Sequence, residues 1–167
     1  MTFQFAKPEA VSKAGLYADL QAQLRSLIEH ERNFIANAAN LSSLLYHTLP
    51  DLNWAGFYLE NNGELVLGPF QGKPACVRIA MGQGVCGTAA EQRKTILVDN
   101  VHEFPGHIAC DSASNSEIVV PLVKHERLIG VLDLDSSLFA RFDDDDAKGL
   151  NELAEIFLDS IGLESNK

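Results

Sequence analysis

The feature that most constrains the fold of this chain is a change in hydrophobic spacing along it. Apolar residues near the start recur at helical spacing: Leu16, Leu20, Leu24, Leu27 and Ile28. This spacing predicts an amphipathic helix over residues 14–30. A second helix is expected over 33–47. In the middle of the chain, aromatic and β-branched runs alternate with turn signals, which predicts strands between residues 52 and 136.

The order of these elements predicts the fold class. Two helices, four or more strands and a closing helix indicate an α+β fold, in which a central antiparallel sheet is flanked by the N-terminal and C-terminal helices. With 167 residues, we expect one domain over residues 1–167. Its parts are expected to be a helical N-terminus over 14–48, a sheet with its loops over 52–136, and a helix over 143–162. The segment 99–115 has no periodicity, and so long a loop is usually functional.

The composition excludes several classes of function. Hydrophobic residues make up 46% of the chain and charged residues 22%, which is typical of a globular protein. A formal net charge of −10 disfavours nucleic-acid partners, because no basic stripe is present. The first ten residues do not resemble a secretion signal, and no apolar run approaches the roughly 20 residues that cross a bilayer. We therefore expect a soluble, cytoplasmic protein.

Three acidic residues are expected to meet at one end of the last predicted hairpin. Asp133 and Asp135 share a strand face with Ile129 and Val131, because side chains alternate along a strand. With a three-residue turn, Glu117 on the preceding strand lies opposite Asp135. Such a cluster on an apolar face is costly unless it binds a cation or shares a proton. The alternative is that the two aspartates end the strand and face water.

Two aromatic residues on the first predicted strand also attract attention. Trp54 and Tyr58 are four residues apart, so they face the same side of the sheet. They are expected either to form the wall of an apolar pocket or to stack on a cation. Two ordinary core aromatics are the alternative.

Metal-binding patterns are weak in this sequence. His102, His107 and Cys110 match no zinc spacing and need a distant fourth ligand. The four aspartates at 143–146 lack the spacing of a calcium loop, so we expect them to cap a helix. We therefore expect no metal.

The chain has three cysteines, Cys76, Cys86 and Cys110, none of them in a Cys-x-x-Cys pair. In a reducing compartment such cysteines are more often redox-active than structural. Cys86 begins a short predicted helix, where the helix dipole lowers the pKa of a thiol, so local physics favours Cys86 as the reactive one. Cys110 lies in the long loop, and Cys76 begins a strand predicted over 75–80. A buried, inert cysteine is the alternative for each.

One segment, His107–Pro121 with the sequence HIACDSASNSEIVVP, resembles the signature of the free methionine-(R)-sulfoxide reductases, which are GAF-domain proteins. The resemblance extends to WAGFY at 54–58, GPFQG at 68–72, GVCG at 84–87 and GVLDLD at 130–135. It covers nearly the whole chain, and the cysteine spacings of 10 and 24 residues are those of the family. The resemblance implies a single GAF domain.

The resemblance also implies roles for the candidate residues. Cys110 is implied to be the nucleophile, Cys76 the main resolving thiol and Cys86 an auxiliary or alternative disulfide partner. The implied substrate-binding residues are Trp54, Tyr58, Glu117, Asp133 and Asp135. The implied substrate is free methionine-(R)-sulfoxide and the implied external reductant is thioredoxin, with no cofactor and no metal. Pairing into a homodimer through the terminal helices is implied as well.

Two other classes of function are compatible with parts of the sequence. GAF domains commonly act as non-catalytic sensors of small molecules, although a cyclic nucleotide would meet a negatively charged protein. A hydrolase built on Cys110 and His107 is also chemically possible. However, it needs an oxyanion hole that the sequence does not specify.

Overall fold

A computed structural model describes residue 5 and residues 12–108 and 110–162 of the chain. Among these residues, no helix has the length and apolarity that crossing a membrane requires. The helices and strands are α1 (Lys13–Ile28), α2 (Phe34–Thr48), β1 (Leu52–Asn61), β2 (Glu64–Gly72), β3 (Arg78–Ala80), α3 (Gly84–Gln92), β4 (Ile96–Val98), the short 3₁₀ helix η1 (Val101–Glu103), β5 (Ser116–Lys124), β6 (Arg127–Ser136) and α4 (Asp144–Ser160).

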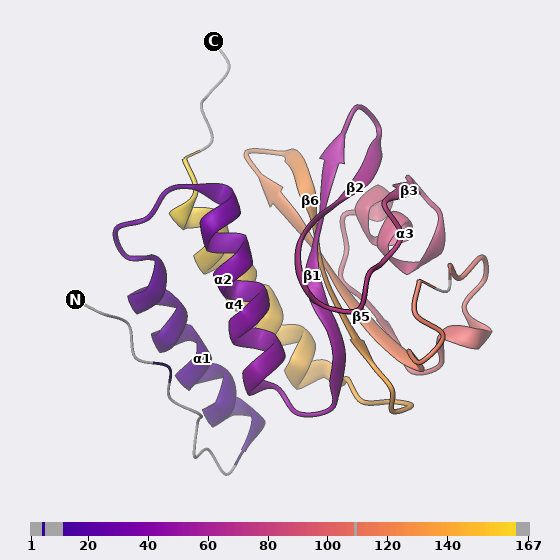
Figure 1. The fold of residues 1–167 in the computed structure, drawn as a ribbon, viewed down its shortest axis with the longest axis horizontal. Helices are drawn as coiled ribbons and strands as arrows, with labels where there is room; N and C mark the ends of the chain where they lie inside the picture. Colours follow the sequence, from indigo (N-terminus) through magenta and orange to yellow (C-terminus); the bar gives the residue numbers. More distant parts are fainter. Residues whose placement is uncertain (1–4, 6–11, 109, 163–167) are drawn as a thin grey trace.

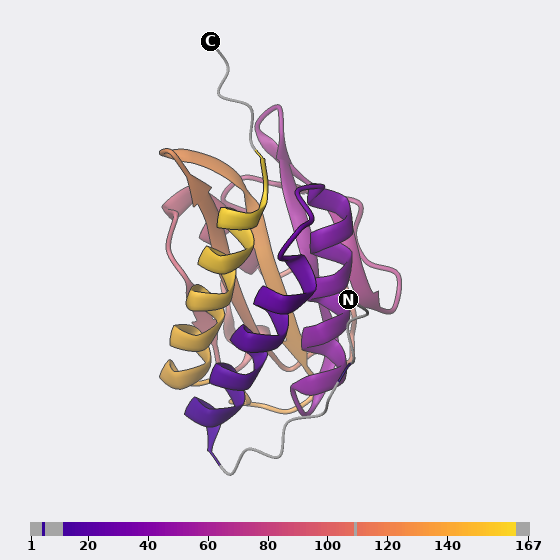
Figure 2. The same ribbon diagram turned by 90° about the vertical axis from the view of Figure 1, so that its left-hand side faces the viewer.

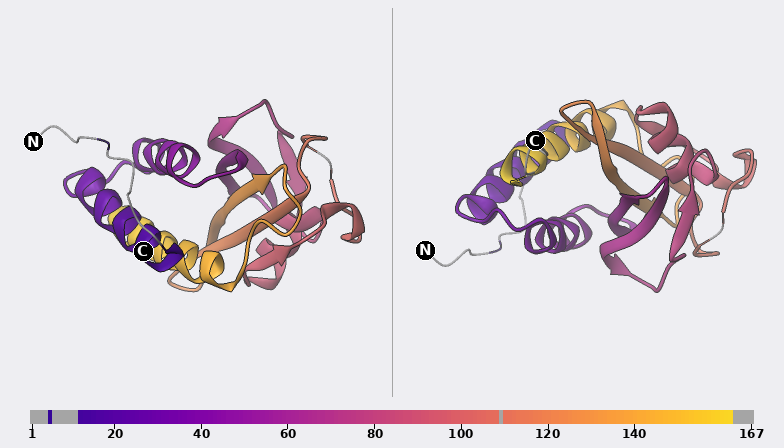
Figure 3. Two further views of the ribbon diagram at one scale, coloured as in Figure 1. Left: turned by 90° about the horizontal axis from the view of Figure 1, so that it is seen from below. Right: turned by 90° about the horizontal axis from the view of Figure 1, so that it is seen from above.

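The strands form one six-stranded antiparallel sheet with the order β3-β2-β1-β6-β5-β4. Helices α1, α2 and α4 lie on one side of this sheet, and α3 lies on the other side (Figure 1). In the view of Figure 2, α1 and α4 run side by side in front of the sheet. The views from below and above in Figure 3 show the same arrangement, with the sheet between the three long helices and α3. The predicted α+β class with an antiparallel sheet is therefore confirmed.

The sheet separates two clusters of buried side chains. The larger cluster joins α1, α2 and α4 to the alternate residues of β1, β5 and β6 that face them. The smaller cluster joins the opposite face of the sheet to α3 and η1, and it includes Trp54, Tyr58, Cys86, Val119 and Val131. The sheet thus has one face packed on a three-helix layer and one face that carries the candidate residues.

A buried carboxylate ties α1 to α4. Asp143 caps α4 in a capping box with Asp146, as the acidic run predicted. Asp146 is 1% exposed and accepts a hydrogen bond of 2.8 Å from the hydroxyl of Tyr17. The ammonium of Lys13 and the guanidinium of Arg141 lie 2.6 and 3.1 Å from its Oδ2. Two cations and a phenol therefore compensate the burial of this charge.

The turn between β5 and β6 differs from the prediction. Lys124 pairs with Arg127, so the turn holds two residues rather than three, and both have positive φ. A β-bulge restores the predicted register, because Leu122 pairs with Gly130 and Val123 pairs with Leu128.

The bulge changes which side chains share a face of β6. Ile129 packs against the helix-side cluster, whereas Val131 packs on the opposite face, so the prediction that these two share a face is wrong. Gly130 has a φ of 158°, and a Cβ there would lie 2.2 Å from the carbonyl oxygen of Tyr58. The sequence therefore places glycine where the backbones of β6 and β1 leave no room for a Cβ.

The strand predicted over 75–80 is shorter than expected. It begins at Arg78, so Cys76 lies in the connection before β3 rather than in a strand. The hydroxyl of Tyr58 donates a hydrogen bond of 3.0 Å to the carbonyl of Cys76, and Nε1 of Trp54 donates one of 3.2 Å to the carbonyl of Lys73. These side chains thus satisfy two carbonyl groups in the connection before β3.

Candidate active site

Three carboxyl groups meet on the α3 side of the sheet. Glu117 of β5 pairs with Asp135 of β6, as the sequence predicted, and Val119 pairs with Asp133. Glu117 and Asp133 are 6% and 5% exposed, and Asp135 is half-buried. All three carboxyls line one pocket rather than ending a strand in bulk water.

Burial raises the pKa of each of these carboxyls. The pKa of Asp133 rises from its ordinary value of 3.8 to about 7 because burial disfavours the charged form. Burial, followed by the charges of Asp133 and Asp135, holds the pKa of Glu117 well above 4.5. Burial and then Asp133 likewise raise the pKa of Asp135. Near neutral pH the cluster therefore retains protons that hydrated carboxyls would have lost.

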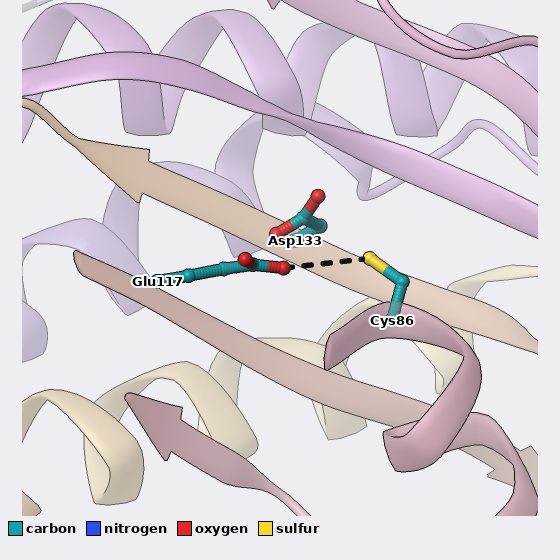
Figure 4. Close-up of side chains that lie close together, drawn as sticks. All are labelled: Cys86, Glu117 and Asp133. Atoms are coloured by element: carbon teal, nitrogen blue, oxygen red, sulfur yellow. Dashed lines mark hydrogen bonds between the residues drawn. The ribbon is translucent and has the colours of Figure 1, made fainter. Parts of the chain in front are cut away.

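Cys86 extends from the first turn of α3 toward these carboxyls (Figure 4). Its thiol is 4% exposed and donates to Oε1 of Glu117 across 3.8 Å. Burial, then the charges of Asp133 and Glu117, raise the pKa of Cys86 well above 9.0. The prediction that the helix dipole makes this thiol reactive is therefore wrong, since burial and the two carboxylates outweigh a partial charge at the helix end.

The other two cysteines form a disulfide. Cys76 and Cys110 are bonded, with their Cα atoms 5.4 Å apart, although 34 residues separate them along the chain. Neither residue lies in a helix or a strand, and both are partly exposed. Cys110 lies on the same pocket as Cys86 and the three carboxyls. The structure thus represents the oxidised chain, with one redox-linked pair of sulfur atoms and one free, buried thiol.

Trp54 and Tyr58 occupy the pocket face of β1, as the sequence predicted. Their rings stack with centroids 5.8 Å apart. The ring of Phe70 on β2 stacks on Trp54 at 5.3 Å. Trp54 and Tyr58 also donate hydrogen bonds from Nε1 and the hydroxyl to the segment before β3. The sequence did not indicate this second role, because it depends on a segment 18 or 19 residues away along the chain.

The sequence analysis did not assign a role to Asp111, which lies next to Cys110 and joins two loops through its carboxylate. Its carboxylate accepts a hydrogen bond of 2.9 Å from the backbone N–H of Ala113 and one of 3.3 Å from the amide of Asn53. The ammonium of Lys73 lies 3.5 Å away. The pKa of Asp111 is lowered by the backbone hydrogen bond first, then by the amide and the ammonium. The carboxylate therefore links the two loops that carry the bonded cysteines.

His107 faces the carboxyl cluster. Its Nε2 lies 4.0 Å from Oε2 of Glu117, and its side chain is 14% exposed. Burial, and then the neighbouring His102, lower the pKa of His107. Nε2 of His102 lies 2.9 Å from Oδ1 of Asn115 instead. Both histidines are in the aperiodic loop, and the sequence analysis had weighed His107 only as a metal ligand or as a partner of Cys110, not as a neighbour of Glu117.

The pocket is chemically divided. Apolar side chains such as Ala75, Ile79, Val85 and Ile108 share its wall with the aromatic rings. The carboxyls, the thiol of Cys86 and the sulfur of Cys110 are among its polar groups, together with Gln83, His107, Asp111 and Ser114. This arrangement suits a small zwitterion or cation with an apolar end, held beside a redox-active sulfur.

Comparisons with known proteins agree with this geometry. Residues 37–159 match the GAF domain family. The chain is 55% identical over 143 residues to the free methionine-R-sulfoxide reductase of Escherichia coli, covering 86% of this chain and 87% of that protein. It is similar in structure to the free methionine-R-sulfoxide reductase of Neisseria meningitidis in complex with its substrate, with a TM-score of 0.91, 44% identity and coverage of 95% of both chains. The fRMsr of Staphylococcus aureus in complex with substrate gives a TM-score of 0.84 at 50% identity, over 87% of this chain and 95% of that one.

Proposed function

The chain belongs to the GAF-domain family of free methionine-(R)-sulfoxide reductases, and from this we propose that it reduces free methionine-(R)-sulfoxide to methionine with Cys110 as the nucleophile. The observation that carries the proposal is the disulfide between Cys76 and Cys110 beside a pocket of buried carboxyls and stacked aromatics. Non-catalytic binding of a small molecule does not require a disulfide beside the pocket, so a sensor function leaves this feature unexplained.

The first step is the reduction of the sulfoxide. The thiolate of Cys110 attacks the sulfoxide sulfur, and the departing oxygen is protonated and transferred to Cys110. The products are a sulfenic acid on Cys110 and free methionine. The oxygen needs an acid near the reacting sulfur, and the raised pKa of the Glu117 and Asp133 carboxyls supports this pair as the donor.

The carboxyl cluster also supports recognition of a free amino acid. Carboxylates in a buried pocket bind an ammonium group, and a methionine within a peptide has none. Asp135 and whichever member of the Glu117 and Asp133 pair is ionised would hold that ammonium. The stacked rings of Trp54 and Tyr58 would surround the thioether and methyl end.

The second step restores the thiol. The sulfenic acid on Cys110 condenses with the thiol of Cys76, which forms the disulfide and releases water. An external dithiol, with thioredoxin as the proposed one, then exchanges with this disulfide and leaves as a disulfide itself. Cys86 lies on the same pocket and is proposed as the alternative partner. Its raised pKa keeps it mostly as a thiol, which supports an auxiliary role.

The direct test is turnover of each epimer of free methionine sulfoxide with dithiothreitol, with methionine as the measured product. The R epimer should be reduced and the S epimer should not. Replacing Cys110 with serine should abolish methionine formation. Cys86→Ser is the matched thiol control, and it should keep more activity than Cys110→Ser. Turnover by Cys110→Ser would refute the nucleophile, and equal turnover of a methionine sulfoxide in a blocked peptide would refute the recognition of the ammonium.

A further inference from the structure

Cys86, Glu117 and Asp133 form a compact group of potential metal ligands. One donor atom from each lies within 4.8 Å of the other two, which makes this the one such group among the described residues (Figure 4). All three side chains are more than nine-tenths buried. Oδ1 of Asp133 is buried without a hydrogen-bond partner among the described residues.

The chemistry of this group favours a cation. Three acidic groups that share an apolar pocket repel one another when ionised, so each requires a proton or a positive charge nearby. A buried oxygen without a partner adds a cost of roughly 1–3 kcal/mol that a ligand can relieve. The mixture of one sulfur and two carboxylate groups suits Zn²⁺ and similar thiophilic ions, whereas Ca²⁺ and Mg²⁺ take oxygen ligands alone.

One distance between two of the donor atoms is close to that found in a zinc site. In a tetrahedral zinc site with Zn–S of 2.3 Å and Zn–O of 2.0–2.2 Å, the sulfur and oxygen ligands are about 3.6 Å apart. Sγ of Cys86 and Oε1 of Glu117 are 3.8 Å apart. For this pair of atoms the required movement is a few tenths of an ångström, and the donor atom of Asp133 lies within 4.8 Å of both. His107, whose Nε2 is 4.0 Å from Oε2 of Glu117, is a nitrogen donor beside the same carboxylate.

We propose that Cys86, Glu117 and Asp133 bind one Zn²⁺ ion per chain, with a fourth position open to water. The ion would cover the carboxyl cluster, so its effect on the chain is to block the pocket rather than to supply chemistry. Cys86 is outside the disulfide, so the site persists when Cys76 and Cys110 are bonded. The proposal therefore goes beyond the proposed function and can be tested on oxidised protein without turnover.

This proposal departs from the sequence analysis, which expected no metal. The residues weighed there were His102, His107 and Cys110, and Cys110 is in the disulfide. The set in the structure comes from α3, β5 and β6, which are brought together only by the packing of α3 on the sheet.

The test is a calorimetric titration of Zn²⁺ into tag-free, oxidised chain in a buffer that does not bind metals. We expect one ion per chain, and at least a tenfold loss of affinity in Cys86→Ser and in Glu117→Gln. Titration with Cd²⁺ should give an ultraviolet thiolate-to-metal charge-transfer band in the parent chain and none in Cys86→Ser. Circular dichroism checks that each variant is folded. If Cys86→Ser does not fold, the affinity of Glu117→Gln for Zn²⁺ is the deciding measurement.

The matched control removes carboxylates elsewhere on the chain. Asp144 and Asp145 are exposed on the first turn of α4, and the double variant Asp144→Asn/Asp145→Asn should leave the affinity for Zn²⁺ unchanged. Equal affinity in Cys86→Ser and the parent chain, or absence of the Cd²⁺ band from the parent chain, would overturn the proposal. A loss of binding confined to the α4 double variant would also overturn it, since an adventitious ion on exposed aspartates would then explain the titration.

Discussion

Replacing Asp133 with asparagine should make the chain more stable at alkaline pH and leave its stability unchanged in acid. The carboxyl of Asp133 is 5% exposed, and burial raises its pKa to about 7. A carboxyl with a higher pKa in the folded than in the unfolded chain binds more protons when folded. The free energy of unfolding therefore falls as the pH rises from about 4 through about 7. Asparagine has nearly the same shape and no charge, so this pH-dependent loss disappears.

The magnitude follows from the two pKa values. The difference between the ordinary 3.8 and about 7 corresponds to about 4 kcal/mol of folding free energy at pH 8, at 1.36 kcal/mol per unit of pKa. Sharing of protons with Glu117 reduces the part that belongs to Asp133, so we expect a gain of about 2–4 kcal/mol. In a chain of this length, that gain raises the melting temperature by roughly 10 °C. At pH 4 the gain should be close to zero.

Equilibrium urea unfolding of the oxidised chain, followed by circular dichroism at pH 4 and pH 8, measures this effect. Reductant is left out so that the disulfide is the same in both proteins. The exposed-site variant Asp144→Asn is the control, and its stability should differ from that of the parent chain by less than about 1 kcal/mol at either pH. An equal gain for Asp133→Asn at both pH values would indicate packing instead of ionisation. No gain at pH 8 would show that burial does not disfavour the charged carboxylate.

Three further outcomes are expected. Without reductant, the pre-reduced double variant Cys76→Ser/Cys86→Ser should release one methionine per chain and keep a sulfenic acid that dimedone labels and mass spectrometry detects; a disulfide-bonded parent chain should stay unlabelled. Gly130→Ala places a Cβ about 2.2 Å from the carbonyl oxygen of Tyr58, so urea unfolding should show a loss of at least about 2 kcal/mol. Asp146→Ala removes the carboxylate shared by two cations and a phenol and should cost about 3–5 kcal/mol in the same assay. A loss below about 1 kcal/mol would contradict either stability prediction.

The sequence contained enough information to predict the fold and the carboxyl cluster. Helical and strand spacing are local properties, so they identified the long helices and the region of strands, but not the order of the strands in the sheet. The pairing of Glu117 with Asp135 was predicted correctly although the assumed turn was wrong, because the bulge at Gly130 compensates for the shorter turn. Alternation alone could not reveal a bulge. That is why Ile129 was placed on the wrong face.

Contacts between distant segments could not be predicted. Local reasoning placed Cys86 at a helix terminus and gave its thiol a low pKa. It could not show that α3 buries this thiol against Glu117 and Asp133, and their charges reverse the sign of the shift. The hydrogen bond from Tyr58 to the carbonyl of Cys76 was missed for the same reason. The physics of each group was known, but the neighbours that decide the outcome come from tertiary packing.

The sheet that separates the two buried clusters also has an evolutionary consequence. Most of the apolar burial is on the side of α1, α2 and α4, while the unfavourable ionisable groups are on the side of α3. Substitutions on the α3 side can therefore change what the pocket holds without removing the packing that keeps the chain folded. A domain with this architecture can acquire new ligands by mutation of one face, because the opposite face supplies the reserve of stability that such changes consume.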